Sequence, residues 1–77
     1  MITPGQSRAA RAFLNWSQRE LAAKCDVGLT AIVGFEAGTS SPRRASLAAL
    51  VRTFEEAGIE FIPAAGGAGP GVRLRAP

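Results

Sequence analysis

Residues 17–38 read SQRELAAKCDVGLTAIVGFEAG, and the spacing within this stretch constrains the fold more than any other feature of the chain. Ser17 followed by Glu20 is a capping box, which predicts that a helix begins at residue 18. The helical pattern breaks over residues 26–28, resumes, and stops at Gly38, a residue typical of helix C-caps. The stretch therefore predicts two short helices joined by a tight turn.

The apolar residues of this stretch stand where two crossed helices need them. Helices that cross at roughly 90–120° through a short turn need a small residue at their closest approach. Ala22 meets that need. Other apolar residues must hold both helices to the core, and these are Leu21, Cys25, Val27, Ile32 and Phe35. The pattern predicts a helix-turn-helix.

A helix is expected on each side of this unit. Thr3 as N-cap and Pro4 at the first helical position predict a helix that ends near Asn15. Its predicted inward face consists of Ala9, Ala10, Phe13 and Leu14. After a loop over residues 38–42, Arg43 or Arg44 begins another helix that Gly58 closes. Its apolar stripe contains Leu47, Leu50, Val51, Phe54 and Ala57.

The last residues of the chain have the pattern of strands, not of helices. Residues 59–62 alternate and are β-branched or aromatic, so they predict a short strand that Pro63 stops. Residues 64–71 form a Gly-rich turn, and residues 72–75 alternate again. An isolated hairpin is marginally stable, so it must pack on the helices or pair with another copy. We predict a helical domain over residues 1–58 and a C-terminal β element over 59–77.

Several motifs resemble those of one known family. They are WSQRELA at residues 16–22, Val27, I--FE-G at 32–38, and Pro42. With the stripe of the last helix, they make residues 4–58 similar to a Cro/C1-type (XRE-family) helix-turn-helix domain. The resemblance implies an all-α, lambda-repressor-like four-helix DNA-binding fold, here with a short C-terminal β-strand or hairpin. It also implies a bacterial transcriptional regulator, such as a repressor, that binds operator DNA as a dimer.

The resemblance also assigns roles to residues. The family's Gln at the start of the second helix contacts the DNA backbone, and here it is Gln18. A buried ion pair is implied between Arg11 and Glu36. The tail resembles the ending of short proteobacterial members, in which GVEFI precedes a Gly-rich loop and a basic strand. It implies a homodimer with contacts from Ile59, Phe61, Ile62, Val72 and Leu74.

The base-reading positions depart from what a sequence-reading helix usually displays. They correspond to Leu29, Thr30, Val33, Gly34 and Ala37. None of these side chains can make the paired hydrogen bonds by which Arg recognises guanine or Gln recognises adenine. We therefore expect weak base readout from this helix, with specificity supplied by DNA shape or by arginines elsewhere.

Two partners remain open for this surface. Double-stranded DNA would be contacted by Ser17, Gln18, Arg19, Gly28, Leu29, Thr30, Ala31, Val33, Gly34, Thr39, Arg43 and Arg44. The alternative is a protein-binding antagonist or co-regulator. In that reading a partner regulator protein covers the apolar surface of Leu29, Ala31, Val33 and Gly34.

Composition narrows the remaining function classes. The 77 residues carry a net charge of +3, and every basic residue except Lys24 is an arginine, which suits a polyanionic partner. There is no His or Tyr and a single cysteine, Cys25, so we expect no enzyme, no metal site and no cofactor. No signal peptide or membrane span is recognisable, which predicts a cytoplasmic protein.

Overall fold

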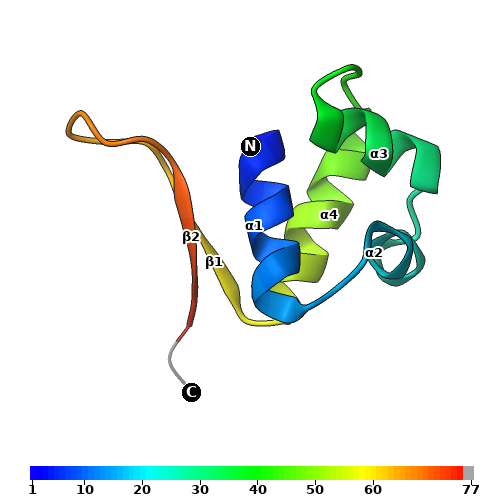
Figure 1. Cartoon of the computed structure of the whole chain (residues 1–77), viewed down its shortest axis with the longest axis horizontal. Helices are drawn as coiled ribbons and strands as arrows, with labels where there is room; N and C mark the ends of the chain where they lie inside the picture. The colour runs from blue at the N-terminus through cyan, green and yellow to red at the C-terminus, as the bar shows by residue number, and fades with distance from the viewer. Residues whose placement is uncertain (76–77) are drawn as a thin grey trace.

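The computed structural model describes residues 1–75 and shows four helices followed by a β-hairpin (Figure 1). In chain order the elements are α1 (Pro4–Leu14), α2 (Gln18–Cys25), α3 (Leu29–Ala37), α4 (Arg44–Glu56), β1 (Ile59–Ile62) and β2 (Gly71–Leu74). This architecture confirms the predicted fold class. Each helix begins and ends within a residue or two of the position that its sequence signals indicated.

Local sequence signals explain how α1 begins and ends. The Thr3 hydroxyl accepts a hydrogen bond from the Gln6 amide at 3.2 Å, and the Gln6 side chain accepts one from the Thr3 amide at 2.8 Å. Pro4 fills the first helical position, where its missing N–H costs nothing. Asn15 ends α1 in the left-handed region at φ 59°. The capping box thus includes Gln6, a partner that we did not predict.

The core lies where the four helices and β1 meet. Leu21, Ile32 and Phe54 are each at most 1% exposed. Trp16 stacks on the Phe54 ring at 5.8 Å between centroids, and Phe61 meets the same ring edge-on at 5.8 Å. Phe54 therefore joins the helical body to the hairpin.

One predicted core residue lies on the surface. Phe13 was expected on the inward face of α1, but 51% of it is exposed. The buried stripe of α1 instead runs through Gln6, Ser7 and Ala10. Because polar residues occupy two of these inward positions, the apolar pattern pointed to the neighbouring flank of the helix. The prediction for Phe13 was wrong.

The two strands pair antiparallel, with Ile59 opposite Leu74 and Phe61 opposite Val72. β2 begins one residue earlier than predicted and ends before Arg75. Ile59, Phe61 and Val72 pack against the helical core. Beyond the strands, the tip of the hairpin projects away from the helices (Figure 1).

Gln6 fastens the hairpin to α1. Its side-chain amide donates to the backbone carbonyls of Ile62 at 3.2 Å and Gly71 at 2.9 Å. These two residues face each other across the hairpin. One buried side chain therefore holds both strands. Within residues 1–75, no helix has the length and apolar character needed to cross a membrane.

Candidate nucleic-acid interface

The turn between α2 and α3 depends on two backbone conformations. Asp26 adopts the left-handed region at φ 57°, and its amide donates to the carbonyl of Ala22. Asp tolerates this conformation through its short polar side chain. Gly28 precedes α3 without a side-chain cap. The first amides of α3 therefore have no capping oxygen from the N-cap side chain, as suits a helix end that faces an anion.

A buried carboxylate holds three helices together. Glu36 on α3 is 3% exposed. Its carboxylate accepts hydrogen bonds from Arg11 on α1, with the shortest at 2.7 Å, and from the Ser7 hydroxyl at 2.5 Å. It also accepts one from the Gln18 side-chain amide on α2 at 3.1 Å. We call Glu36, Arg11, Ser7 and Gln18 the Glu36 cluster.

The electrostatics of the Glu36 cluster favour the charged form of the carboxyl. Burial alone would raise the pKa of Glu36, but the hydrogen bonds from Arg11, Ser7 and Gln18 and the Arg11 charge lower it below its ordinary value. Arg11 also donates to the carbonyl of Trp16 at 3.1 Å. The cluster therefore fixes the direction of α3 relative to α1 and α2.

The structure refines two of the predicted DNA contacts on α2. The Ser17 hydroxyl accepts from the Glu20 amide at 3.0 Å, so one of its lone pairs is used in the capping box and its O–H group is left for another contact. Gln18 donates one amide hydrogen to Glu36. A side-chain amide carries two hydrogens, so the second hydrogen and the carbonyl oxygen of Gln18 are left for another contact. Glu36 thereby orients Gln18 at the start of α2.

The structure gives Gly34, one of the predicted base-facing positions, a packing role next to the following loop. A Cβ added there would lie 2.2 Å from the Ser40 hydroxyl oxygen, so this side of α3 faces its own following loop. The Gly34 carbonyl accepts from the Thr39 amide at 2.9 Å and the Ser40 amide at 3.2 Å. Gly34 is therefore explained by the close approach of the loop over 39–40.

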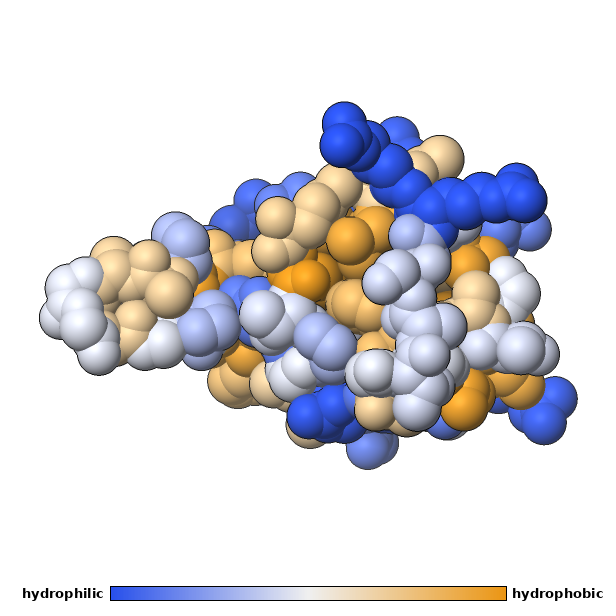
Figure 2. Space-filling view, turned by 90° about the horizontal axis from the view of Figure 1, so that it is seen from above, coloured by the Kyte–Doolittle hydropathy of each residue, from blue (hydrophilic) through white to orange (hydrophobic). Residues whose placement is uncertain are grey.

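The other predicted contact residues divide by exposure. Arg19, Gly28, Thr30, Val33, Thr39, Arg43 and Arg44 are exposed, whereas Leu29 and Ala31 are half-buried. Val33 is the most exposed large apolar residue of α3, at 43%. Strongly hydrophilic side chains stand at the rim of the body when the molecule is seen from above (Figure 2). Among the exposed residues of α3, none has a side chain that can bond two base atoms at once.

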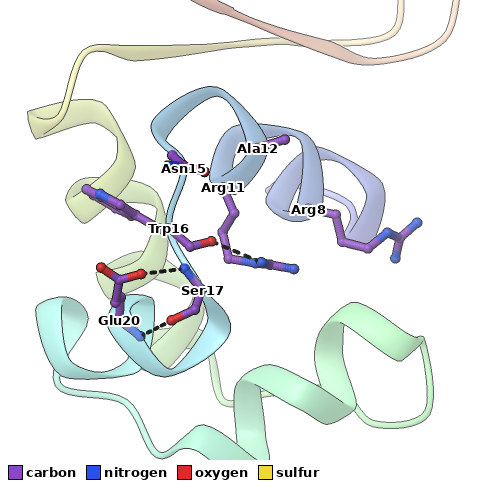
Figure 3. Close-up of a pocket in the computed structure, with 7 residues that line it drawn as sticks. All are labelled: Arg8, Arg11, Ala12, Asn15, Trp16, Ser17 and Glu20. Carbon is purple, nitrogen blue, oxygen red and sulfur yellow. Dashed lines mark hydrogen bonds between the residues drawn. The ribbon is translucent and has the colours of Figure 1, made fainter.

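The structure places one more arginine, Arg8, next to the Glu36 cluster. The sequence analysis did not include it among the site residues. The Arg8 guanidinium donates to the backbone carbonyl of Glu36, near the C-terminal end of α3. It also lies with Arg11, Ser17 and Glu20 on the wall of a cleft of about 510 Å³ between the end of α1 and the start of α2 (Figure 3). The sequence did contain a signal that Arg8 lies near Arg11. Arg8 comes three residues before Arg11, and residues at i and i+3 share a helix face.

The predicted dimer contacts also divide by exposure. Ile59 is 1% exposed, so its side chain has no surface to offer a second chain. Phe61 and Val72 are half-buried against the core. Leu74 is 49% exposed. Of the five predicted side chains, Leu74 is therefore the most accessible.

Taken together, a capped α2, a tight turn and an outward α3 define a helix-turn-helix DNA-binding protein. A family model described as "Helix-turn-helix" matches residues 8–60. The chain therefore belongs to the Cro/C1-type (XRE) helix-turn-helix family, whose domains bind DNA and are not enzymatic. A search of curated proteins finds no match. Family membership makes the chain, in general terms, a DNA-binding regulator.

Proposed function

We propose that the protein is a transcriptional regulator that binds operator DNA as a homodimer and contacts the DNA mainly at its phosphates. α3 enters the major groove, and Gln18, Arg19, Thr39, Arg43 and Arg44 contact the backbone on either side. Two units on a two-fold axis then require a pseudo-palindromic site.

The observation that carries this proposal is a contrast within α3. The helix is held firmly in place, but its exposed face has no long polar side chain that could recognise a base. The Glu36 cluster ties α3 to two other helices. A helix presented in this way needs only short side chains to approach the groove, while phosphate contacts set the register. Thr30 can give one hydrogen bond, and Leu29 and Val33 can touch a thymine methyl. Base discrimination is then modest, and DNA shape supplies part of the specificity.

Replacing two arginines tests the proposal. Arg43→Ala with Arg44→Ala is expected to weaken binding to the DNA upstream of the protein's own gene by at least about tenfold at low salt, because phosphate contacts dominate affinity. The loss should be similar for unrelated sequences. Arg52→Ala, an exposed arginine further along α4, is the matched control and should leave affinity nearly unchanged. Equal affinity of the double variant and the wild type would exclude these arginines from the interface.

A second candidate function rests on the apolar surface of α3. Val33 is 43% exposed and lies beside Leu29 and Ala31, which are half-buried. In this alternative a partner regulator protein covers the surface, and the chain acts as an antagonist or co-regulator. Absence of binding to any DNA at low salt, together with capture of a regulator that Val33→Asp abolishes, would favour it.

A further inference from the structure

A pocket of about 540 Å³ opens between the start of the chain, α4 and the hairpin. Hydrophobic side chains gather where the hairpin joins the helical body (Figure 2). We call this space the α4–hairpin pocket, and the residues that define it include Ile2, Gln6, Val51, Glu55, Phe61 and Pro70. Its volume lies within the range of about 300–1,000 Å³ that is typical of small-molecule sites.

The floor of the α4–hairpin pocket is apolar and only partly covered by the protein. Ile2 belongs to the buried core, whereas Val51 and Phe61 are half-buried and pack against that core. Phe61 also meets the Phe54 ring edge-on at 5.8 Å between centroids, which holds its own ring in place. The pocket therefore offers an apolar floor with an aromatic ring, and a ligand that covers it removes this surface from water.

Two prolines give the hairpin side of the pocket a fixed shape. Pro63 and Pro70 occupy the next pair of positions beyond the last paired residues of β1 and β2. The ring of proline restricts its backbone and leaves it no N–H to donate. Next to them, Gln6 holds both strands through the carbonyls of Ile62 and Gly71. A pocket whose walls are already in place binds a ligand at a lower entropic cost.

One polar group of the pocket differs from the others in having no partner. The Gln6 side chain donates to the two strand carbonyls and accepts from the Thr3 amide at 2.8 Å. By contrast, within residues 1–75 no ion pair or side-chain hydrogen bond engages the Glu55 carboxylate. Arg75 is bonded to the backbone carbonyl of Glu55 at 2.6 Å. Of the described residues that line the pocket, Glu55 alone has a charged side chain.

We propose that the α4–hairpin pocket binds a small organic cation with an aromatic body and one ammonium group. The aromatic body covers Ile2, Val51 and Phe61, and the ammonium group pairs with the Glu55 carboxylate. A cation fits this pocket better than a neutral or anionic molecule of the same shape, because it alone is attracted to Glu55. The site does not depend on DNA binding. In a regulator of the kind proposed above, the ligand is an effector.

Such a ligand connects α4 to the hairpin. It contacts α4 at Val51 and Glu55 and the hairpin at Phe61, and Gln6 on the same wall fastens both strands. A ligand that binds the folded arrangement stabilises it against opening. Saturating ligand should therefore slow hydrogen exchange in β1 and β2.

Titration of the full, isotope-labelled chain with phenethylamine tests the site, with the backbone amide signals as the readout. Saturable shifts are expected at pocket residues such as Phe61. Phenethyl alcohol and phenylacetate are matched ligands, because they combine a similar aromatic body with a neutral or an anionic group. The alcohol should bind about threefold more weakly than the amine, since an exposed ion pair contributes modestly. The acid should bind at least about fivefold more weakly, because Glu55 repels it.

Two pairs of variants locate the ligand. Glu55→Gln should weaken amine binding about threefold and leave alcohol binding unchanged. Its matched control is Glu56→Gln, which changes a neighbouring exposed carboxyl outside the pocket lining and should affect neither ligand. Ala64→Trp places a large side chain on the exposed wall and should weaken both ligands by at least about tenfold. Ala65→Trp, outside the lining, should not, and circular dichroism checks that each variant is folded.

The outcomes separate this inference from the proposed function. Shifts that do not saturate, equal affinity for the three ligands, or a Glu55→Gln variant that binds the amine like the wild type would each overturn the cation site. Amine affinity that falls as the protein concentration rises would show that a second copy covers the pocket, and it would overturn the site as well. DNA affinity is measured separately without ligand. A chain that binds DNA at low salt but no amine would lose this inference and keep the proposed function.

Discussion

α3 and the hairpin both extend from one core, but different forces hold them. α3 is fixed by the Glu36 cluster, in which a buried charge is bonded to groups on α1 and α2. The hairpin is fixed by the Gln6 bonds and by contact of Phe61 with Phe54. A buried charge that needs several hydrogen-bond partners restricts the orientation of its helix closely. Neutral hydrogen bonds and ring packing allow small displacements of the hairpin. We therefore expect α3 to be held more rigidly than the hairpin.

The largest expected effect comes from breaking the Glu36 cluster. Glu36→Ala should lower the free energy of unfolding by about 3–5 kcal/mol, because it leaves the partly buried Arg11 charge without its partner. Urea denaturation measures the loss. Glu56→Ala, on the exposed side of α4, is the control and should change stability by less than about 0.5 kcal/mol. Equal losses from the two variants would mean that the cluster does not hold α3.

A smaller effect is expected at the hairpin. Gln6→Ala removes the two bonds to the strands and one half of the α1 capping box, and it should cost about 2–3 kcal/mol. Thr3→Ala disturbs the same capping box but leaves the hairpin bonds, so it should cost about 1 kcal/mol. Hydrogen exchange should accelerate at β1 and β2 in the Gln6 variant more than in the Thr3 variant. The same exchange rates in both would show that Gln6 does not fasten the hairpin.

Gly34→Ala tests how closely the loop approaches α3. Alanine normally favours a helix by about 1 kcal/mol over glycine, yet here its Cβ would lie 2.2 Å from the Ser40 oxygen. The exposed Ser40 hydroxyl can rotate away, but the Ser40 Cβ, which would lie at 3.3 Å, must also shift. We therefore expect a net loss of less than about 1 kcal/mol. In a Ser40→Ala background the loss should shrink, as thermal denaturation of the four variants can show. An increase in stability for Gly34→Ala alone would contradict the tight contact.

The smallest predicted effect is a dependence on pH. The pKa of Glu36 is lower in the folded chain than in the unfolded chain. Its contribution to stability is therefore complete above the unfolded value of about 4.3 and is lost as the pH falls through the folded value. The stability of wild type relative to Glu36→Gln should decline across that acidic range and stay constant near neutrality. A difference that does not vary with pH would argue against a charged Glu36.

The sequence predicted the helix-turn-helix well because its signals are local. Ser17 and Glu20 form the expected capping box, and Asp26 adopts the expected turn. The stripe of α4 also places Leu50 and Phe54 in the core. Each of these features depends on residues within one turn of a helix, which pattern analysis can recognise.

Features that join distant segments could not be predicted in the same way. Ser7 is bonded to Glu36 from 29 positions away, and Gln6 to Gly71 from 65 positions away. Both are buried polar residues, so an apolar pattern pointed to Phe13 in their place. The role of Gly34 likewise depends on how the following loop folds back. Such contacts follow from tertiary packing.

The salt dependence of DNA affinity tests the central claim most directly, because phosphate contacts release counterions when they form. For the wild-type chain on a duplex from upstream of its own gene, the plot of log affinity against log salt should have a slope of about −4 or steeper. An unrelated duplex should give a similar slope and an affinity only modestly weaker. A shallow slope, or no binding at low salt, would contradict a helix-turn-helix that grips DNA by its phosphates.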